Sequence, residues 1–495
     1  MNGPRPRAAA ARLLLRSIAL VYLIAFVSLA VQIKGLYGAR GILPAAQYLD
    51  YLSQRLGPDA WQAHPTVFWL GASDAMLTGV CWAGAASALL LMMGVLPTIT
   101  ALLCWLLYFS LYQIGRVFLG FQWDILLLET GFLAIFLAPM RLRQQAGYDP
   151  EPSPVVIWMF RWLVFRLMFA SGAVKLLSND PVWWNLTALE YHYWTQPLPT
   201  WTAWLANQLP AVLQRFSCAM MFGVELGASW LALGPRRARL AGFFLLVGLQ
   251  FLIAATGNYT FFNLLSASLC LSLLDDDAID AMLDRVQPKR LVAGRWPREP
   301  VVRSHAAMLR TAVLAIVALP LAVCGGALMI ARFRGFDVLP PPVLKLVAVL
   351  EPWHVTSSYG LFSVMTKHRP EVILEGSEDG QQWVEYPFRW KPVDVARRPR
   401  FVAPHQPRLD WQMWFAALDD WRRSPWLVEL ERRLLEGSPD VIALLASDPF
   451  HGKPPHHVRA MLYEYEFTDW TAHRETGAWW KRRPVGQFSP TLSRP

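Results

Sequence analysis

The amino-acid sequence predicts a polytopic α-helical membrane protein, with about nine transmembrane helices, that carries a C-terminal α+β soluble domain. Only 17% of the 495 residues are charged, whereas soluble proteins carry about a quarter. Apolar runs long enough to cross a bilayer recur within residues 1–338, and the 24 tryptophans suit aromatic belts at the membrane interfaces. Residues 339–495 show instead the turn and alternation patterns of a folded α+β domain.

The membrane spans are predicted from length, because a spanning helix needs about twenty mostly apolar residues. Runs of this kind lie near residues 12–33, 67–94, 97–115, 118–139, 155–177, 211–233, 239–256, 259–274 and 309–331. The run at 259–274 is short, so one span fewer is the alternative. Basic residues precede the first run, but no small-residue cleavage site follows it, so we expect a membrane anchor and not a signal peptide.

Loop charges predict the orientation in the membrane. Lysine and arginine cluster at 141–143, 236–239 and 275–305, whereas 34–66 and 178–210 are poorer in them and richer in tryptophan and proline. Because cytoplasmic loops carry the excess of basic residues, the N-terminus is predicted inside and residues 339–495 outside, as an extracytoplasmic domain. With one span fewer, this domain would lie inside. No basic stripe interleaved with aromatic residues stands apart from the spans, so we expect no nucleic-acid partner despite the net charge of +10.

The C-terminal domain shows local patterns of both strand and helix. Residues 371–390 (EVILEGSEDGQQWVEYPFRW) predict a hairpin that turns at Asp379-Gly380. Residues 409–423 and 424–437 predict two amphipathic helices, the second of which ends at Gly437. YEYEF at 463–467 and the residues around 479–486 predict two further strands.

Known enzyme and metal motifs do not occur in the sequence. Each of the five cysteines lies in an apolar run, and no Cys/His spacing typical of zinc is present. His451, His456 and His457 share one loop, but no cysteine or carboxylate completes a ligand set. There is no Gly-x-Ser-x-Gly elbow and no Cys/His nucleophile pattern, so the protein is not itself a recognisable lipase. We therefore expect no metal and no cofactor, and an enzyme activity is the less favoured interpretation.

The most informative candidate site is the stretch from Asp180 to Pro199, which lies between two predicted spans on the outside. Its candidate residues for binding a client or substrate are Trp183, Trp184, Glu190, His192, Tyr193, Trp194 and Gln196. Rings with polar tips suit a surface that holds a partly folded protein, and they equally suit a helix that lies on lipid. Glu190 and His192 are two residues apart and do not share a helix face, which disfavours an acid–base pair.

Charged residues within the apolar runs form a second candidate group: Asp74, Asp124, Glu129, Arg161, Arg166, Lys175 and Glu225. A charge at the bilayer centre costs at least ~2.5 kcal/mol unless it is paired. Arg166 and Lys175 lie on a predicted neighbouring span and are the expected partners of Asp124 and Glu129. Two interpretations stay open: a polar cavity for a substrate or proton, and ion pairs that register the helices.

Membrane lipid is an expected partner at the outer end of the first span. The stretch from Gly35 to Pro44 is rich in glycine, but it follows no strand and lacks the Gly-Lys-Ser/Thr of a phosphate-binding loop. We expect Gly35, Gly38 and Gly41 to permit tight turns and Arg40 to contact a lipid headgroup.

Several long stretches resemble one protein family in sequence and in order. They are RLMFASGAVKLLSNDPVWWNLTALEYHYWTQPLP (166–199), TGNYTFFNLL (256–265), SSYGLFSVMTKHRPEVILEG (357–376), RRPRFVAPHQPRLDWQMWFAAL (397–418) and ALLASDPFHGKPPHHVR (443–459). With these stretches the chain strongly resembles the lipase maturation factor family, over essentially its whole length. The membrane half is also similar to the multi-helix domain of the vitamin K-dependent carboxylase group.

The resemblance implies a membrane-bound maturation or folding factor that assists secreted homodimeric lipases, with a lipase as its client. Vertebrate members of the family lie in the endoplasmic reticulum membrane. The short N-terminus and the Ala/Arg/Leu-rich composition here favour a bacterial cytoplasmic membrane, with the C-terminal domain outside. The alternative implied by the carboxylase-like half is a membrane-embedded enzyme that acts on a lipid or peptide in a polar intramembrane cavity.

Overall fold

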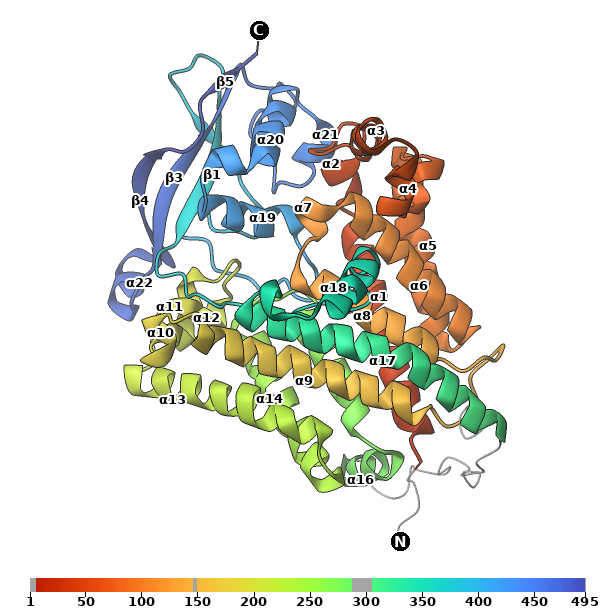
Figure 1. Ribbon diagram of the computed structural model, residues 1–495. Coiled ribbons are helices and arrows are strands. Elements are labelled where there is room, and N and C mark those ends of the chain that lie inside the picture. Colours follow the sequence, from red (N-terminus) through yellow and green to blue (C-terminus); the bar gives the residue numbers. More distant parts are fainter. Residues whose placement is uncertain (1–5, 146–148, 287–304, 495) are drawn as a thin grey trace.

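A bundle of long helices carries a small sheet domain at one end in the computed structural model (Figure 1). The structure describes residues 6–145, 149–286 and 305–494. The helices of the bundle are α1 (Ala8–Ala30), α5 (Asp74–Met93), α6 (Pro97–Ile114), α8 (Gln122–Leu137), α9 (Pro154–Leu177), α13 (Ala211–Phe222), α14 (Arg236–Thr256), α15 (Phe262–Cys270) and α17 (His305–Arg334). A π turn and a 3-10 turn continue α13 to Leu233.

Shorter helices connect these elements and cover their outer ends. They are α2 (Ile33–Tyr37), α3 (Ala45–Leu56), α4 (Ala60–Ala63), α7 (Arg116–Leu119), α10 (Pro181–Trp184), α11 (Ala188–Thr195), α12 (Trp201–Asn207), α16 (Asp276–Val286) and α18 (Pro341–Leu350). The glycine-rich stretch forms a tight connection against the C-terminal domain, since a Cβ atom on Gly35 would lie 2.4 Å from the Asp440 carbonyl. Arg40 is exposed there, and its carbonyl accepts a hydrogen bond of 2.7 Å from Ser438.

Seven helices of the described chain are long and apolar enough to cross a membrane, which confirms the predicted fold class. They coincide with seven of the predicted runs. The runs at 118–139 and 259–274 form the shorter helices α8 and α15. At 1.5 Å per residue, α8 is about 24 Å long, and α15 with the turn that follows it is about 18 Å long. Both are shorter than the ~30 Å apolar thickness of a bilayer.

The N-terminus and the C-terminal domain lie at opposite ends of the bundle (Figure 1). At one end, Arg12 pairs with Asp149 at 2.8 Å and Arg236 pairs with Asp275 at 2.6 Å. At the other end, Gln32 donates a hydrogen bond of 2.8 Å to the Gln406 carbonyl. The chain thus passes from one end of the bundle to the other an odd number of times, as the sequence predicts, although α8 and α15 are short. Which end faces the cytoplasm stays a prediction.

The C-terminal domain is built on an antiparallel sheet in the order β2-β1-β3-β4, with β5 beside β3. The strands are β1 (Pro370–Ser377), β2 (Val384–Glu385), β3 (His457–Phe467), β4 (Trp480–Gln487) and β5 (Leu492–Ser493). The helices are α19 (Arg408–Ala417), α20 (Pro425–Leu435), α21 (Pro439–Ile442) and α22 (Trp470–Thr476). The predicted hairpin is present, because β1 pairs with β2 and the Asp379 carboxylate accepts hydrogen bonds from the amides of Gln381 and Gln382 between them.

The region around the predicted boundary at 338/339 belongs structurally to the bundle. Helix α18 packs against α17 through Val347, Cys324 and Ala327. The chain then crosses the end of the bundle and enters β1. The division into domains at this residue stays a prediction.

Candidate functional site

The aromatic segment, from Asp180 to Pro199, forms helices α10 and α11 between the end of α9 and the start of α13. The Asp180 carboxylate caps α10, because its Oδ1 accepts a hydrogen bond of 3.0 Å from the Val182 amide. Its Oδ2 accepts a hydrogen bond of 2.8 Å from the Met365 amide, in the stretch that leads into β1. One carboxylate thus begins the aromatic segment and also ties it to the C-terminal domain.

The C-terminal domain binds the end of α11 through its backbone carbonyls. Arg369 donates hydrogen bonds to the carbonyls of Trp194 (2.8 Å), Gln196 and Pro197 (2.9 Å). The Trp414 indole donates a hydrogen bond of 2.8 Å to the Thr195 carbonyl. The last carbonyls of a helix lack partners within it, and a cation suits that end of the helix dipole.

The charge of Arg369 is fully buried and faces a carboxylate of the sheet. Glu371 lies 2.7 Å from Arg369 and also pairs with Lys391 at 2.9 Å. Burial lowers the pKa of Arg369, and the Glu371 carboxylate opposes that shift. Arg369 contacts both Glu371 of the sheet and the carbonyls of the aromatic segment, so it links the segment and the sheet into one structural unit.

The loop after α14 holds the other side of the aromatic segment. Gln196 donates a hydrogen bond of 2.8 Å to the Thr256 carbonyl and accepts one of 3.0 Å from the Tyr259 hydroxyl. Asn258 joins the same loop to the C-terminal domain: it donates to the Arg400 carbonyl (2.8 Å) and accepts from the Val402 amide (2.8 Å). We call this contact region between the aromatic segment, residues 256–259 and the C-terminal domain the joint.

Glu190 and His192 do not form a pair with each other. Glu190 pairs with Arg215 at 3.2 Å, and His192 Nε2 lies 2.8 Å from the Tyr259 hydroxyl. Burial, and secondarily the positive charge of Lys175, lowers the pKa of His192 to about 4. The imidazole is therefore neutral near pH 7 and forms a hydrogen bond with the Tyr259 hydroxyl at the joint.

Most of the predicted client-binding side chains are buried or half-buried. Trp183 and Gln196 are 2% exposed and Tyr193 is 8% exposed, so these three offer no surface to a client in this structure. Glu190, His192 and Trp194 are half-buried. Trp184 is 60% exposed and presents its ring to the outside. Client binding by this segment stays a prediction, and it now rests on Trp184.

Asp124 pairs with a residue of the C-terminal domain, which corrects the expectation that Arg166 or Lys175 is its partner. Arg408, the first residue of α19, lies 3.0 Å from Asp124, and both side chains are fully buried. Arg408 also donates a hydrogen bond of 2.6 Å to the Phe118 carbonyl, and Tyr108 donates one to Asp124. The charge within the predicted span therefore fixes α19 to the end of the bundle that carries the C-terminal domain.

Glu129 pairs with Arg166, as the sequence predicts, and both contact the chain beyond the bundle. Glu129 accepts hydrogen bonds from the Ser357 amide (3.0 Å) and the Tyr359 hydroxyl (2.6 Å). Arg166 donates one of 2.9 Å to the Ser357 carbonyl. A Cβ atom at Gly325 of α17 would lie 2.7 Å from the guanidinium carbon of Arg166, so this glycine makes room for the pair.

The remaining charges of the second group serve the bundle itself. Lys175 pairs with Glu225 at 2.6 Å, where the sequence pattern suggested Asp124 or Glu129. Arg161 donates a hydrogen bond of 3.0 Å to the Ser272 carbonyl. Asp74 is the first residue of α5 and is partly exposed, so it lies at the end of the predicted span instead of within it. The span begins later than the sequence suggests because Ser73 caps the helix there.

The three histidines predicted to share one loop do not all lie in it, because His457 is the first residue of β3. His457 contacts the Ser493 hydroxyl at 2.7 Å, and His456 lies 4.0 Å from Glu378. Within the described ranges, no group of three or more His, Cys, Asp or Glu side chains is arranged to hold a metal ion.

Comparison with models of protein families identifies the family of this chain. A model described as the lipase maturation factor transmembrane domain matches residues 9–281, and one for the lipase maturation factor C-terminal domain matches residues 355–490. The chain belongs to the lipase maturation factor family. Lipase maturation factor 2 of Xenopus laevis is 38% identical over 95% of this chain and 80% of its own length. The human lipase maturation factor 2 is 37% identical over 97% of this chain and 82% of its own length.

Lipase maturation factor 1 is a more distant relative. The protein of Bos taurus with this name is 32% identical over 97% of this chain and 88% of its own length. No solved structure matches the chain.

The residues that hold the joint together fall within the stretches that carry the family resemblance. Arg369, from 357–376, and Asn258, from 256–265, contact the aromatic segment within 166–199. Tyr359, from 357–376, and Arg408, from 397–418, bind Glu129 and Asp124 of the bundle. Their partners are backbone carbonyls and distant carboxylates, which no local pattern indicates. The family stretches are the sequence feature that could have indicated these contacts. They lie far apart in the sequence but converge on one region of the fold.

Proposed function

We propose that this protein is a membrane-bound maturation factor that helps secreted lipases reach their active state. The proposal rests on family membership across nearly the whole chain, with relatives named lipase maturation factor 2 and lipase maturation factor 1. In this proposal the protein acts by binding a partly folded lipase, without making or breaking a bond. Release follows when the client buries its own apolar core.

The position of the C-terminal domain supports this proposal. It covers the end of the bundle opposite the N-terminus, and the basic residues at 236–239 lie at the N-terminal end. Because basic loops favour the cytoplasm, we infer that the C-terminal domain faces the extracytoplasmic space, where secreted chains fold. The proposed location is a bacterial cytoplasmic membrane, or the endoplasmic reticulum membrane in a eukaryotic cell.

The test is deletion and restoration of the gene in its own organism. Total protein and enzymatic activity of the secreted lipases are measured together. We expect lipase protein to persist while its specific activity falls, and we expect the restored gene to rescue it. Unchanged specific activity of every secreted lipase would contradict the proposal.

We propose that the client surface includes the exposed ring of Trp184. The buried or half-buried neighbours Trp183, Glu190, His192, Tyr193, Trp194 and Gln196 position the helices that present it. A large, exposed ring on a rigid support is typical of residues that contribute most to binding. Trp184 also donates a hydrogen bond of 3.2 Å to the Leu176 carbonyl, which holds the ring beside the end of α9.

Replacing Trp184 with alanine is expected to reduce the yield of active lipase by about fivefold or more. The amount of inserted protein and its Tm in detergent should stay unchanged, because the ring is mainly exposed. Trp61→Ala is the matched control, since Trp61 is also an outer-end tryptophan and is 59% exposed. Normal lipase maturation by the Trp184→Ala variant would remove this ring from the client surface.

A further inference from the structure

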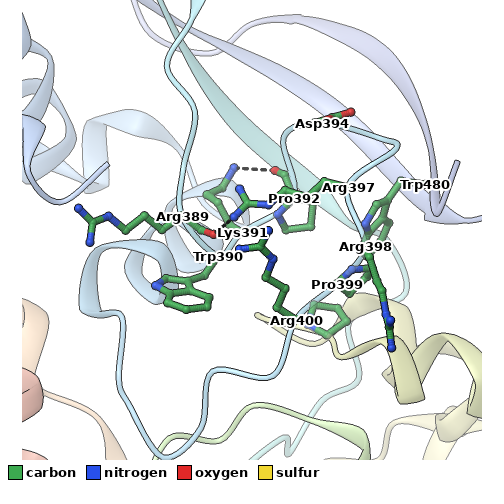
Figure 2. Close-up of a pocket in the computed structure, with 11 residues that line it drawn as sticks. Arg389, Trp390, Lys391, Pro392, Asp394, Arg397, Arg398, Pro399, Arg400 and Trp480 are labelled. Atoms are coloured by element: carbon green, nitrogen blue, oxygen red, sulfur yellow. Dashed lines mark hydrogen bonds between the residues drawn. The ribbon is translucent and has the colours of Figure 1, made fainter. Parts of the chain in front are cut away.

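A cleft lined by arginines lies where the C-terminal domain meets the loop after the aromatic segment (Figure 2). It is shallow: its interior holds about 20 Å³, roughly one water molecule, and it opens at its mouth, where a larger group can contact its lining. Its charged lining residues are Arg389, Lys391, Asp394, Arg397, Arg398 and Arg400. Pro199 forms the wall on the side of the bundle, and Trp390 and Trp480 form apolar walls.

The positive charges of this cleft exceed the negative ones. Lys391 shares the single carboxylate of Glu371 with Arg369. Arg389 donates to the carbonyls of Leu445 and Ala443, and Arg397 donates to those of Phe388 and Arg389. Within residues 6–145, 149–286 and 305–494, no ion pair joins a carboxylate to Arg389, Arg397, Arg398 or Arg400. The Asp394 carboxylate caps the Ala396 amide at 2.9 Å and is the acidic member of the lining.

Two of these arginines point towards each other. Figure 2 shows the side chains of Arg397 and Arg400 directed into the cleft beside Trp390, whereas Arg389 points away from it. Burial, and next the positive charge of Arg400, lowers the pKa of Arg397. Like charges that face each other across a cleft repel, and an anion between them removes that repulsion and accepts charge-assisted hydrogen bonds.

The cleft lies at the outer end of a span that faces lipid. Helix α14 ends at Thr256, and most of its apolar window is unburied. Directly after it, Gly257 pairs with Pro199 of the cleft wall, and Asn258 donates its hydrogen bond to the Arg400 carbonyl. The backbone of Arg400 is therefore hydrogen-bonded directly to the loop that follows α14.

Aromatic residues of the kind found at membrane interfaces surround the arginines. The guanidinium carbon of Arg398 lies 4.5 Å from the centre of the Trp201 ring. Phe401, next to Arg400, is 44% exposed, and its ring lies 6.2 Å from that of Trp201. Tryptophan and basic side chains gather at the level of the lipid headgroups.

We propose that this cleft binds the phosphate of an anionic phospholipid in the leaflet on the side of the C-terminal domain. In this proposal, Arg400 supplies a guanidinium without an ion-pair partner, and Arg397 supplies one that is held in place by backbone carbonyls. Arg398, stacked on Trp201, lies along the lipid headgroup. A lipid is favoured over an acidic segment of a protein, because the cleft opens where α14 meets the headgroup layer. The bound lipid holds the C-terminal domain against the membrane next to the joint.

The test uses the full-length protein in detergent, with lipid binding followed by native mass spectrometry. Phosphatidylglycerol, phosphatidylcholine, inorganic phosphate and a glutamate-rich peptide are compared as probes. We expect phosphatidylglycerol to bind more tightly than phosphatidylcholine. Arg400→Gln should weaken phosphatidylglycerol binding by about fivefold, as expected for one basic side chain at an anionic surface, and Arg400→Lys should retain most of it. Arg422→Gln is the control, since Arg422 is exposed but paired with Asp420.

Each of the three following outcomes would overturn the proposal. Equal binding of phosphatidylglycerol by wild type and Arg400→Gln would show that the lipid binds elsewhere. If inorganic phosphate competes while phosphatidylglycerol binds no better than phosphatidylcholine, the cleft is a site for free phosphate. If the peptide alone binds in an Arg400-dependent way, the cleft recognises protein. The Arg400 side chain makes no hydrogen bond to the described residues, so its replacement should leave the Tm unchanged and the comparison valid.

Discussion

Replacing Arg408 with methionine is expected to prevent accumulation of the folded protein in the membrane. Arg408 and Asp124 are fully buried and lie 3.0 Å apart, so removal of the cation leaves an uncompensated carboxylate inside the bundle. Breaking a buried pair in this way costs about 3–5 kcal/mol, which is a large fraction of the stability of a typical domain. The measurement is the amount of full-length protein in the membrane fraction and its Tm in detergent.

A second replacement distinguishes the charge from the shape of the site. The double variant Asp124→Asn with Arg408→Met removes both charges, and replacing a whole buried pair is often nearly neutral. We therefore expect the double variant to recover most of the protein lost in Arg408→Met. Arg422→Met is the control, because its pair with Asp420 is exposed and should contribute little. Equal loss in the single and double variants would show that hydrogen bonds of Arg408 to Phe118 and Tyr108, and not the ion pair, hold α19 in place.

The bundle could be predicted from the sequence because its determinants are local. Length and apolar content suffice to locate a span, and the Asp-Gly turn with its flanking alternation suffices for the β1–β2 hairpin. The limits of this reasoning appear at α8 and α15, where packing within the bundle supports helices too short for a bilayer. Local sequence patterns do not predict the length of a helix whose ends are determined by packing against neighbouring elements.

The contacts between the bundle and the C-terminal domain, including the joint, could not be predicted, because they link residues far apart in the chain. Asp124 and Arg408 are separated by 284 positions, and Arg408 looks from its neighbours like an ordinary residue at a helix start. Asn258 looks like a helix cap in a tight turn, and its amide instead joins the carbonyls of Leu198 and Arg400. The rings of the aromatic segment look exposed for the same reason, since nothing in that segment shows that the C-terminal domain covers it.

Replacing Arg369 with methionine is expected to separate lipase maturation from membrane insertion. Its side chain binds three carbonyls at the end of α11, and those acceptors are left without partners when the guanidinium is removed. Each buried unsatisfied acceptor costs about 1–3 kcal/mol, so loss of these three contacts shifts the balance from the docked towards the released domain by more than about a hundredfold. The bundle retains its own pairs, such as Lys175 with Glu225, and should still insert.

The variant therefore tests whether maturation needs the aromatic segment and the C-terminal domain as one unit. We expect the Arg369→Met protein to reach the membrane, to lose protease resistance between α18 and β1, and to mature lipase poorly. Arg459→Met is the matched control, because Arg459 pairs with Glu375 on the same sheet at 2.7 Å and does not touch the aromatic segment. If Arg369→Met releases the domain yet matures lipase normally, the client is handled by one part alone. In that case the buried network at the joint serves only the stability of the fold.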